Sequence, residues 1–380
     1  MISFRKSIWT LGTVGGVLAA LLQVVCAQTT SSPQPAPTWT LKLSDVRGIP
    51  TPTIGGETHL LFLDDQHLVI TQVDSTEGNH VNISIASVNA ESGALIKTQA
   101  VNAMEGGRHT VKTTLVNGGA LILLAGQTLT KYSSDLRVLA ARNLPPNKWR
   151  IPGFNREIDG SWSIFGSLSN SRAFLGRTGP RGYSEGQWIS AATLADDGPK
   201  LKRGFRNAVL TNAGFAFNDF SDHIEFQKLG EEYSHPMCPE CEGAVEAAFG
   251  GDFVFVACKP ASSFFVADSS GAVLHRVTQG KEPDNIKWTS GAANARRVAY
   301  TTGVISLRAS PQSTGRVVVF DLDRKENILD LNLVSNGKAE NTNGFTIVGF
   351  ASPQVALSPN GLRLAVLSER AIQLYQLRKP

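Results

Sequence analysis

One short pattern recurs seven times along this chain of 380 residues: an apolar strand, a turn rich in Gly, Asp, Asn or Ser, and another strand. The seventh copy is one strand short. Its turn at Ser358–Gly361 leads into two apolar strands, 362–368 and 372–375, after which only five residues follow. A lone strand-like segment, Trp39–Val46, stands near the other end. We therefore expect the two ends of the chain to complete one sheet together.

This recurrence predicts an all-β fold of successive four-stranded sheets. Third strands are expected to begin near residues 85, 129, 189, 224, 264, 317 and 372, so the repeat is about 48 residues long, as in propeller blades. One such sheet cannot bury both of its faces, so neighbouring sheets must pack against each other around an axis. The prediction is a seven-bladed β-propeller over residues 38–380, closed by pairing of the N-terminal strand with the C-terminal blade. Because the spacing is irregular, six or eight blades are alternatives.

Two local assignments follow from turn chemistry and periodicity. Asp196-Asp197-Gly198 is predicted to be a hairpin turn, since Asp-Gly supplies the positive φ that tight hairpins need. Glu242–Phe249 is predicted to be either a strand or two turns of helix, and no longer helical periodicity is found elsewhere.

The last repeat carries a motif of its own. Ala351–Val366, with Ser358-Pro359-Asn360-Gly361 followed by Leu364-Ala365, resembles the Ser-Pro-Asp-Gly-x-x-Leu-Ala signature of WD40-like and YVTN-type β-propellers. Asn360 stands where the signature has Asp, and the Trp-Asp dipeptide of true WD40 repeats is absent. The resemblance covers only this blade well. It implies a propeller and little about function, because the scaffold hosts binding modules, scaffolds and several types of enzyme.

The N-terminus is predicted to be a cleaved signal peptide, residues 1–27. Arg5 and Lys6 precede an apolar stretch, and Val25-Cys26-Ala27 places small residues before a cleavage site that leaves Gln28 first. An uncleaved anchor and a lipidated Cys26 are alternatives. Residues 28–37 are rich in Ser and Pro and are expected to form an extended spacer. We therefore expect a secreted or periplasmic protein with no membrane span in the mature chain.

Charge argues against a nucleic-acid partner. Loss of Arg5 and Lys6 with the signal lowers the formal net charge from +4 to +2, and no run of Lys and Arg exceeds two residues. Binding to nucleic acid normally needs clustered cations that release counterions. We expect no nucleic-acid partner, and a monomer.

The cysteines form the one compact constellation that could carry chemistry. His235, Cys238 and Cys241 lie close together in the sequence, and Cys258 follows them. In an exported protein we expect one disulfide, Cys258 with Cys238 or Cys241, which would stabilise by about 3 kcal/mol. The alternatives are a tetrahedral zinc site of His235, Cys238, Cys241 and Cys258 and a redox Cys-x-x-Cys. Apart from that zinc, no cofactor is predicted.

No catalytic motif is found, so an enzyme is not the favoured expectation. Two loop stretches rich in Arg and aromatic residues, Trp149–Arg156 and Arg177–Tyr183, could form a binding rim. The favoured function is a binding or scaffold module for a protein, peptide or glycan. The alternative is a propeller enzyme with a site in the axial channel, such as a lactonase or a glycan-active hydrolase.

Overall fold

The computed structural model divides the chain into two units, 1–34 and 35–380, and every described residue belongs to the second. The description covers residues 35–47, 57–75, 81–102, 111–116, 119–150, 157–166, 171–179, 184–201, 208–211, 213–218, 223–228, 230–231, 233–237, 242–249, 253–259, 263–268, 270, 272–278, 286–292, 296–303, 313–335, 340–342, 345–347, 354–368 and 371–379. The predicted signal peptide and most of the predicted spacer lie outside it. None of the helical segments that the structure describes is both long and apolar enough to cross a bilayer.

Seven four-stranded antiparallel sheets make up the described part of the second unit, as the repeats predict. Blade 1 holds β2 (Glu57–Phe62), β3 (His67–Ser75), β4 (Val81–Asn89) and β5 (Leu95–Asn102). Blade 2 holds β6 (Val111–Val116), β7 (Ala120–Ala125), β8 (Thr128–Tyr132) and β9 (Val138–Asn143). Blade 3 holds β12 (Ser161–Gly166), β13 (Arg172–Thr178), β14 (Ser184–Ser190) and β15 (Asp196–Leu201).

The remaining blades follow the same order. Blade 4 holds β16 (Ala208–Leu210), β17 (Gly214–Asn218), β18 (Ile224–Lys228) and β19 (His235–Pro236). Blade 5 holds β20 (Glu242–Phe249), β21 (Phe253–Lys259), β22 (Ser263–Asp268) and β23 (Val273–Thr278). Blade 6 holds β24 (Ile286–Ala292), β25 (Arg297–Gly303), β26 (Ser313–Asp321) and β27 (Glu326–Ser335). Blade 7 holds β30 (Gln354–Leu357), β31 (Arg363–Ser368), β32 (Ala371–Gln376) and β1 (Trp39–Lys42). Of the two readings for Glu242–Phe249, the structure shows the strand.

Two short hairpins interrupt this order. The first, β10 (Lys148–Arg150) with β11 (Glu157–Asp159), lies between blades 2 and 3. The second, β28 (Glu340–Thr342) with β29 (Phe345–Ile347), lies between blades 6 and 7.

The two ends of the chain share blade 7. β1 pairs antiparallel with β32, and Trp39 lies opposite Leu374. The predicted pairing is therefore confirmed, but the strand ends at Lys42 rather than Val46. A 3₁₀ turn, η1 (Leu43–Asp45), follows because it buries Leu43 and Val46 among side chains of blades 1 and 7, where a continuing strand would place them at the sheet edge.

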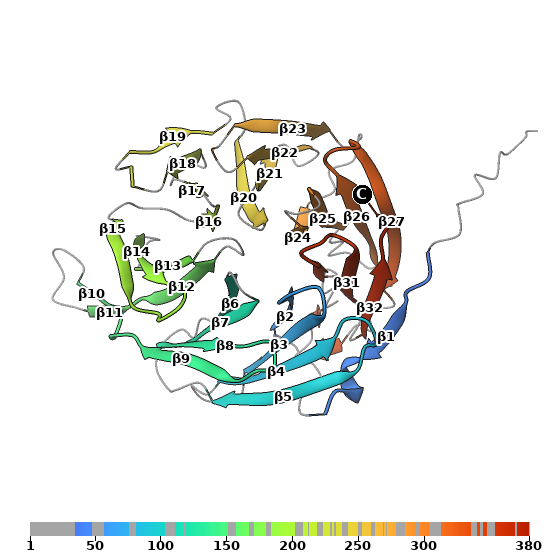
Figure 1. The fold of residues 1–380 in the computed structure, drawn as a ribbon, viewed down its shortest axis with the longest axis horizontal. Helices are drawn as coiled ribbons and strands as arrows, with labels where there is room; N and C mark the ends of the chain where they lie inside the picture. The colour runs from blue at the N-terminus through green and yellow to red at the C-terminus, as the bar shows by residue number, and fades with distance from the viewer. Residues whose placement is uncertain are drawn as a thin grey trace, which may run out of the picture. The chain divides into compact units, whose positions relative to one another are not determined.

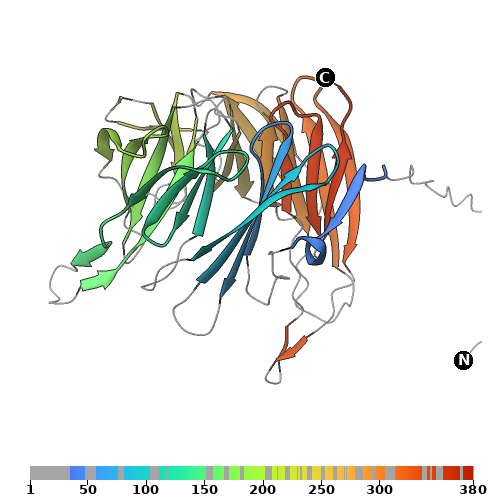
Figure 2. The same cartoon turned by 60° about the horizontal axis from the view of Figure 1, so that its bottom comes forward.

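Each blade packs against two neighbours (Figures 1 and 2). Among the described side chains, five seams are mainly aliphatic. Two show aromatic contacts: Phe174, Trp188, Phe215 and Phe217 between blades 3 and 4, and His275 stacked on Phe320 between blades 5 and 6. Middle strands are buried on both faces, as in β7, where every side chain is buried. This explains the continuous apolar runs of the sequence.

The turn between the third and fourth strands has a common cap. The residue that ends the third strand accepts backbone N–H groups of the turn through its side chain, as Asn89, Ser190, Asp268 and Asp321 all do. In blade 3 this cap moves the turn to residues 191–195, where Leu194 takes a φ of 61°. The turn predicted at Asp196–Gly198 is therefore wrong: these residues begin β15.

Candidate functional site

The two stretches predicted to form a binding rim meet beside blade 3. Arg177, in β13, places its guanidinium carbon 4.7 Å from the centre of the Trp149 ring on β10. We call the β10–β11 hairpin together with Arg177 and Gly179 the Trp149 ledge. The remainder of the two stretches, 151–156 and 180–183, lies outside the described residues.

Arg177 holds the ledge to blade 3 through several groups at once. Its Nε donates to Oδ1 of Asn147 at 2.5 Å, and its Nη2 donates to the backbone oxygen of Lys148 at 2.6 Å. The carboxylate of Glu185 lies 3.6 Å from Nη1. A guanidinium offers five N–H donors in a planar fork and can also stack on an aromatic ring, which no other side chain combines.

Gly179 allows the close approach of the backbone to the indole. An ideal Cβ at this position would lie 2.5 Å from Cδ2 of Trp149, far inside van der Waals contact. Any larger residue would therefore push the ring or the strand end away. The Arg-Thr-Gly sequence at 177–179 thus supplies a cation for one contact with the ring and an open space for another.

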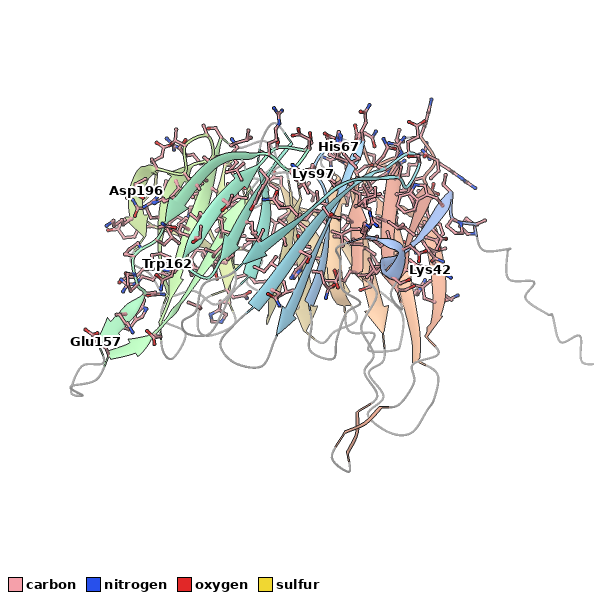
Figure 3. All side chains as sticks on the ribbon, turned by 90° about the horizontal axis from the view of Figure 1, so that it is seen from below. Lys42, His67, Lys97, Glu157, Trp162 and Asp196 are labelled. Carbon is pink, nitrogen blue, oxygen red and sulfur yellow. The ribbon has the colours of Figure 1, made fainter. Side chains whose placement is uncertain are left out.

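The hairpin carries charged side chains on its exposed surface. Lys148 pairs with Asp159 across the two strands, and the hydrogen bond and charge of Asp159 raise the pKa of Lys148. Glu157 adds to the same effect. In Figure 3 Glu157 lies at the edge opposite His67, Lys97 and Asp196, so the ledge is on the side away from the starts of β3, β5 and β15.

Asn147 connects the hairpin with the first strand of blade 3. Its Nδ2 donates to the backbone oxygen of Ser161 at 2.8 Å, and its own backbone oxygen accepts the N–H of Gly160. Trp162 adds an indole hydrogen bond to the backbone oxygen of Pro145. The ledge is therefore fixed before any partner arrives, which lowers the entropy cost of binding.

Only part of the predicted cysteine constellation lies within the described residues. His235 is exposed on β19, with its Nε2 3.9 Å from a carboxylate oxygen of Glu231. The backbone of Cys258 lies in β21, opposite Gly243 and Ser263, and nothing of its side chain is described. Cys238 and Cys241 lie outside the described residues. Within those residues no group of three or more His, Cys, Asp and Glu could hold a metal ion. The disulfide and the zinc site stay predictions.

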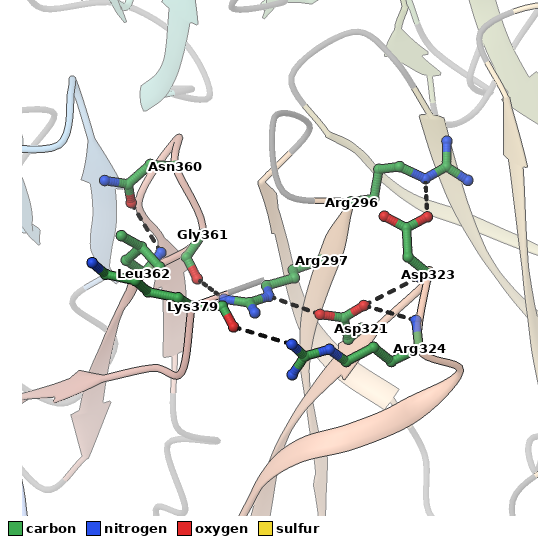
Figure 4. A network of polar contacts seen from close by, with 9 residues as sticks. All are labelled: Arg296, Arg297, Asp321, Asp323, Arg324, Asn360, Gly361, Leu362 and Lys379. Carbon is green, nitrogen blue, oxygen red and sulfur yellow. Dashed lines mark hydrogen bonds and ion pairs between the residues drawn. The ribbon is translucent and has the colours of Figure 1, made fainter.

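A buried charge network between blades 6 and 7 was missed by sequence reasoning (Figure 4). Arg297 is fully buried, and its Nε donates to Oδ2 of Asp321 at 3.1 Å. Its Nη1 donates to the backbone oxygen of Gly361 at 2.7 Å, which ties blade 6 to the turn of the Ser-Pro-Asn-Gly motif. The network joins two blades, and its central pair of Arg297 and Asp321 is buried, so we assign it to stability.

Comparison with known proteins identifies the fold. No protein-family model matches the chain, and no curated protein does. Among solved structures, a chain of the mitotic checkpoint complex is 9% identical with a TM-score of 0.52 and full coverage of both chains. Hsv2 of Kluyveromyces marxianus is 11% identical with a TM-score of 0.52 over 85% of this chain and 97% of that one. The WD40 domain of Neurospora crassa Pan2 is 8% identical with a TM-score of 0.51 over 91% and 96%.

At these identities the likeness concerns the fold alone. Together with the sheet order, it shows that the protein has the fold of a WD40-like β-propeller, as the resemblance of the last repeat implies.

Proposed function

We propose that this protein is an exported binding module that engages a protein or peptide through the Trp149 ledge. The observation that carries the proposal is the pre-organised pair of Arg177 and Trp149 on a hairpin that leaves the regular blade order. Trp and Arg are the residues most often found at energetic centres of protein interfaces.

The fold supports a binding role without specifying the partner. A propeller presents its inter-blade connections on a rigid frame, and loops on a rigid frame commonly carry recognition. One of the similar solved chains belongs to an assembly, the mitotic checkpoint complex. On the ledge, Lys148, Asp159 and Glu157 carry both signs of charge, and strand alternation places them on the face of the hairpin opposite the indole. A hairpin with charged residues beside an aromatic anchor favours a polar protein surface over a purely apolar ligand.

Binding is tested with purified mature protein as bait and three variants. Trp149→Ser removes the indole, Arg177→Lys keeps the charge but loses the fork, and Lys200→Glu changes a charge on blade 3 outside the ledge. We expect a captured protein to be lost with Trp149→Ser, reduced with Arg177→Lys and retained with Lys200→Glu. Equal capture by the native protein and all three variants would refute binding through the ledge. Binding on a glycan array with the same dependence on Trp149 would correct the class of partner.

Export is tested separately. Cleavage after Ala27 predicts a mature chain that begins at Gln28, and intact-mass measurement of protein recovered outside the cytoplasm would show it. Recovery of the full-length chain in the membrane fraction would favour the uncleaved anchor instead.

A further inference from the structure

The fourth strands of four blades share a bulge at the same place. In blade 1, Val88 lies opposite Leu95 while Ser87 lies opposite Lys97, so Ile96 is an extra residue on the outer strand. Registers of blades 2, 5 and 6 shift in the same way at Tyr132, Ala267 and Phe320. The extra residue is apolar each time: Ile96, Leu139, Leu274 and Ile328. Four equivalent outer positions can therefore be compared directly.

In blade 6 this position is covered by the protein itself. Ile328 is partly buried and packs against the apolar cluster between blades 6 and 7, to which Leu377 near the chain's end also belongs. Nearby, Arg324 in the same turn donates from Nη2 to the backbone oxygen of Lys379 at 3.3 Å. The last residues of the chain thus lie against the outer edge of blade 6, and they offer apolar side chains at alternate positions and an acceptor oxygen to a turn cation.

In blades 1 and 2 the equivalent apolar residues are exposed. We call Leu95, Ile96, Val138 and Leu139 the rim patch; Val138 and Leu139 keep 55% and 54% of their surface in contact with solvent. The two halves of the patch are neighbours, because Nζ of Lys97 donates to the backbone oxygen of Leu136 at 3.3 Å. Exposed apolar residues that cluster across two elements commonly mark an interaction site.

The charge around the rim patch selects one kind of occupant. Cations outnumber carboxylates in the adjoining strands and turns, with Lys97, Lys131 and Arg137 against Glu91 and Asp135. Arg137 is 73% exposed and contacts Asp135 at 2.7 Å, and Lys97 has no ion-pair partner among the described residues. A second copy of this chain would bring like charges together, which is unfavourable. A partner with carboxylates would be attracted.

We propose that the rim patch binds an extended segment of a partner protein that carries large apolar side chains at alternate positions and acidic side chains between them. The apolar side chains cover Val138, Leu139, Leu95 and Ile96, as the cluster between blades 6 and 7 partly covers Ile328. The carboxylates meet Arg137 and Lys97. This surface lies at the start of β9, whereas the Trp149 ledge follows the end of the same strand, so it is a second docking surface and does not depend on the first.

The test uses two fluorescent peptides of equal length, one alternating Leu with Glu and one alternating Leu with Lys, with fluorescence anisotropy as the readout. The decisive variant is the double change Val138→Ser and Leu139→Ser. Its matched control is Val273→Ser with Leu274→Ser, since these residues occupy the same bulge in blade 5 and are also exposed, while Ala272 replaces Arg137 there. All four changed side chains are exposed, so folding should survive, and thermal unfolding of each variant checks this.

We expect the Leu-Glu peptide to bind the native protein and the blade 5 variant equally, and the blade 2 variant about tenfold more weakly. The single variant Arg137→Glu should bind the Leu-Glu peptide more weakly than the native protein does, most clearly in low salt. Trp149→Ser should leave it unchanged, which separates this proposal from the ledge. Equal binding of the Leu-Lys peptide, no difference between the two double variants, or no binding at all would overturn the proposal. Sedimentation showing a dimer that Leu139→Ser abolishes would replace the partner segment by a second copy.

Discussion

Two seams of this propeller differ in the contacts that supplement ordinary apolar packing. Between blades 6 and 7, an aliphatic cluster is joined at the turn end by a charged group: Arg297 and Asp321 of blade 6 have side chains that are 0% and 3% exposed, and Arg297 bridges to Gly361 of blade 7. Between blades 3 and 4, the buried cluster consists of four aromatic side chains and Leu210. Phe174, Phe215 and Phe217 stack in sequence with centres 5.4 and 5.1 Å apart, and Trp188 meets Phe174 edge-on at 5.3 Å.

The two seams should therefore respond differently to substitutions. A buried ion pair stabilises only while both partners are present, because either one alone is an uncompensated charge in a medium of low polarity. An aromatic cluster gains from many small contacts and loses them in proportion to the atoms removed. A single substitution in the Arg297–Asp321 pair should therefore cost much stability, whereas a substitution in the aromatic cluster should cost stability in proportion to the atoms removed.

Removal of the cation from the charged seam should have the largest effect. Arg297→Ala leaves Asp321 buried without its partner and should lower the free energy of unfolding by about 3–5 kcal/mol. The combined change of Arg297→Met and Asp321→Leu should restore much of the loss, since Nη2 of Arg297 is itself buried without a hydrogen-bond partner among the described residues. Urea unfolding measures both. A single variant as stable as the native protein would show that the pair is not buried in solution.

A single change in the aromatic seam should cost less. Phe215→Leu keeps an apolar side chain but removes ring contacts to Phe174, Trp188 and Phe217, so we expect a loss of about 2 kcal/mol by the same measurement. If this loss exceeds that of Arg297→Ala, the ranking of the two seams is reversed.

In blade 7 an equivalent arginine, Arg363, also reaches the neighbouring blade, but it is less buried than Arg297. Arg363 begins the second strand of its blade, as Arg297 does in blade 6, and its Nη1 donates to the backbone oxygen of Asp65 in blade 1. It is only partly buried, so Arg363→Met should cost about 1 kcal/mol. The control is Lys379→Met, an exposed cation near the same end of the chain, which should change unfolding little. Similar losses of stability in the two variants would show that the hydrogen bond from Arg363 to Asp65 does not stabilise the contact between blades 7 and 1.

The smallest effect should be a pH dependence at the seam between blades 5 and 6. Burial, with the charge of nearby Lys325, lowers the pKa of His275, whose ring stacks on Phe320 at 5.3 Å. The unfolded chain therefore binds the proton more readily, so stability is complete above the ordinary pKa of 6.5 and falls as pH decreases through that value toward the lower folded pKa. His275→Gln should flatten the dependence of the unfolding midpoint between pH 7 and pH 5.5. Identical slopes would remove His275 from the explanation.

Much of the fold was accessible from local patterns. The short seventh repeat and the lone segment at Trp39 predicted the pairing of β1 with β32. Each would otherwise leave an unpaired strand edge, and pairing with each other satisfies both. The Arg and aromatic stretches at 149 and 177 were suspected as a rim. That Arg177 would stack on Trp149 was not predicted, since the contact depends on the space left by Gly179.

The errors were also local in origin. Asp196-Asp197-Gly198 has the composition of a turn, but Ser190 caps the preceding residues, and the two carboxylates pair instead with Arg142 and Arg172 from strands far away in sequence. The composition of this segment is compatible with a turn or with the start of a strand. The residues that the fold places beside it decide between the two.

The all-β repeats and the sharing of one sheet by the chain's two ends follow from the sequence, because strand periodicity and turn chemistry act over a few residues. Three other outcomes arise from the folded molecule: Arg297 is buried against Gly361, Trp149 lies under Arg177, and Val138 and Leu139 stay exposed while Ile328 is partly buried. These outcomes depend on which blade or chain end lies beside each residue. That proximity comes from the packing of whole sheets, and no short pattern of residues contains it.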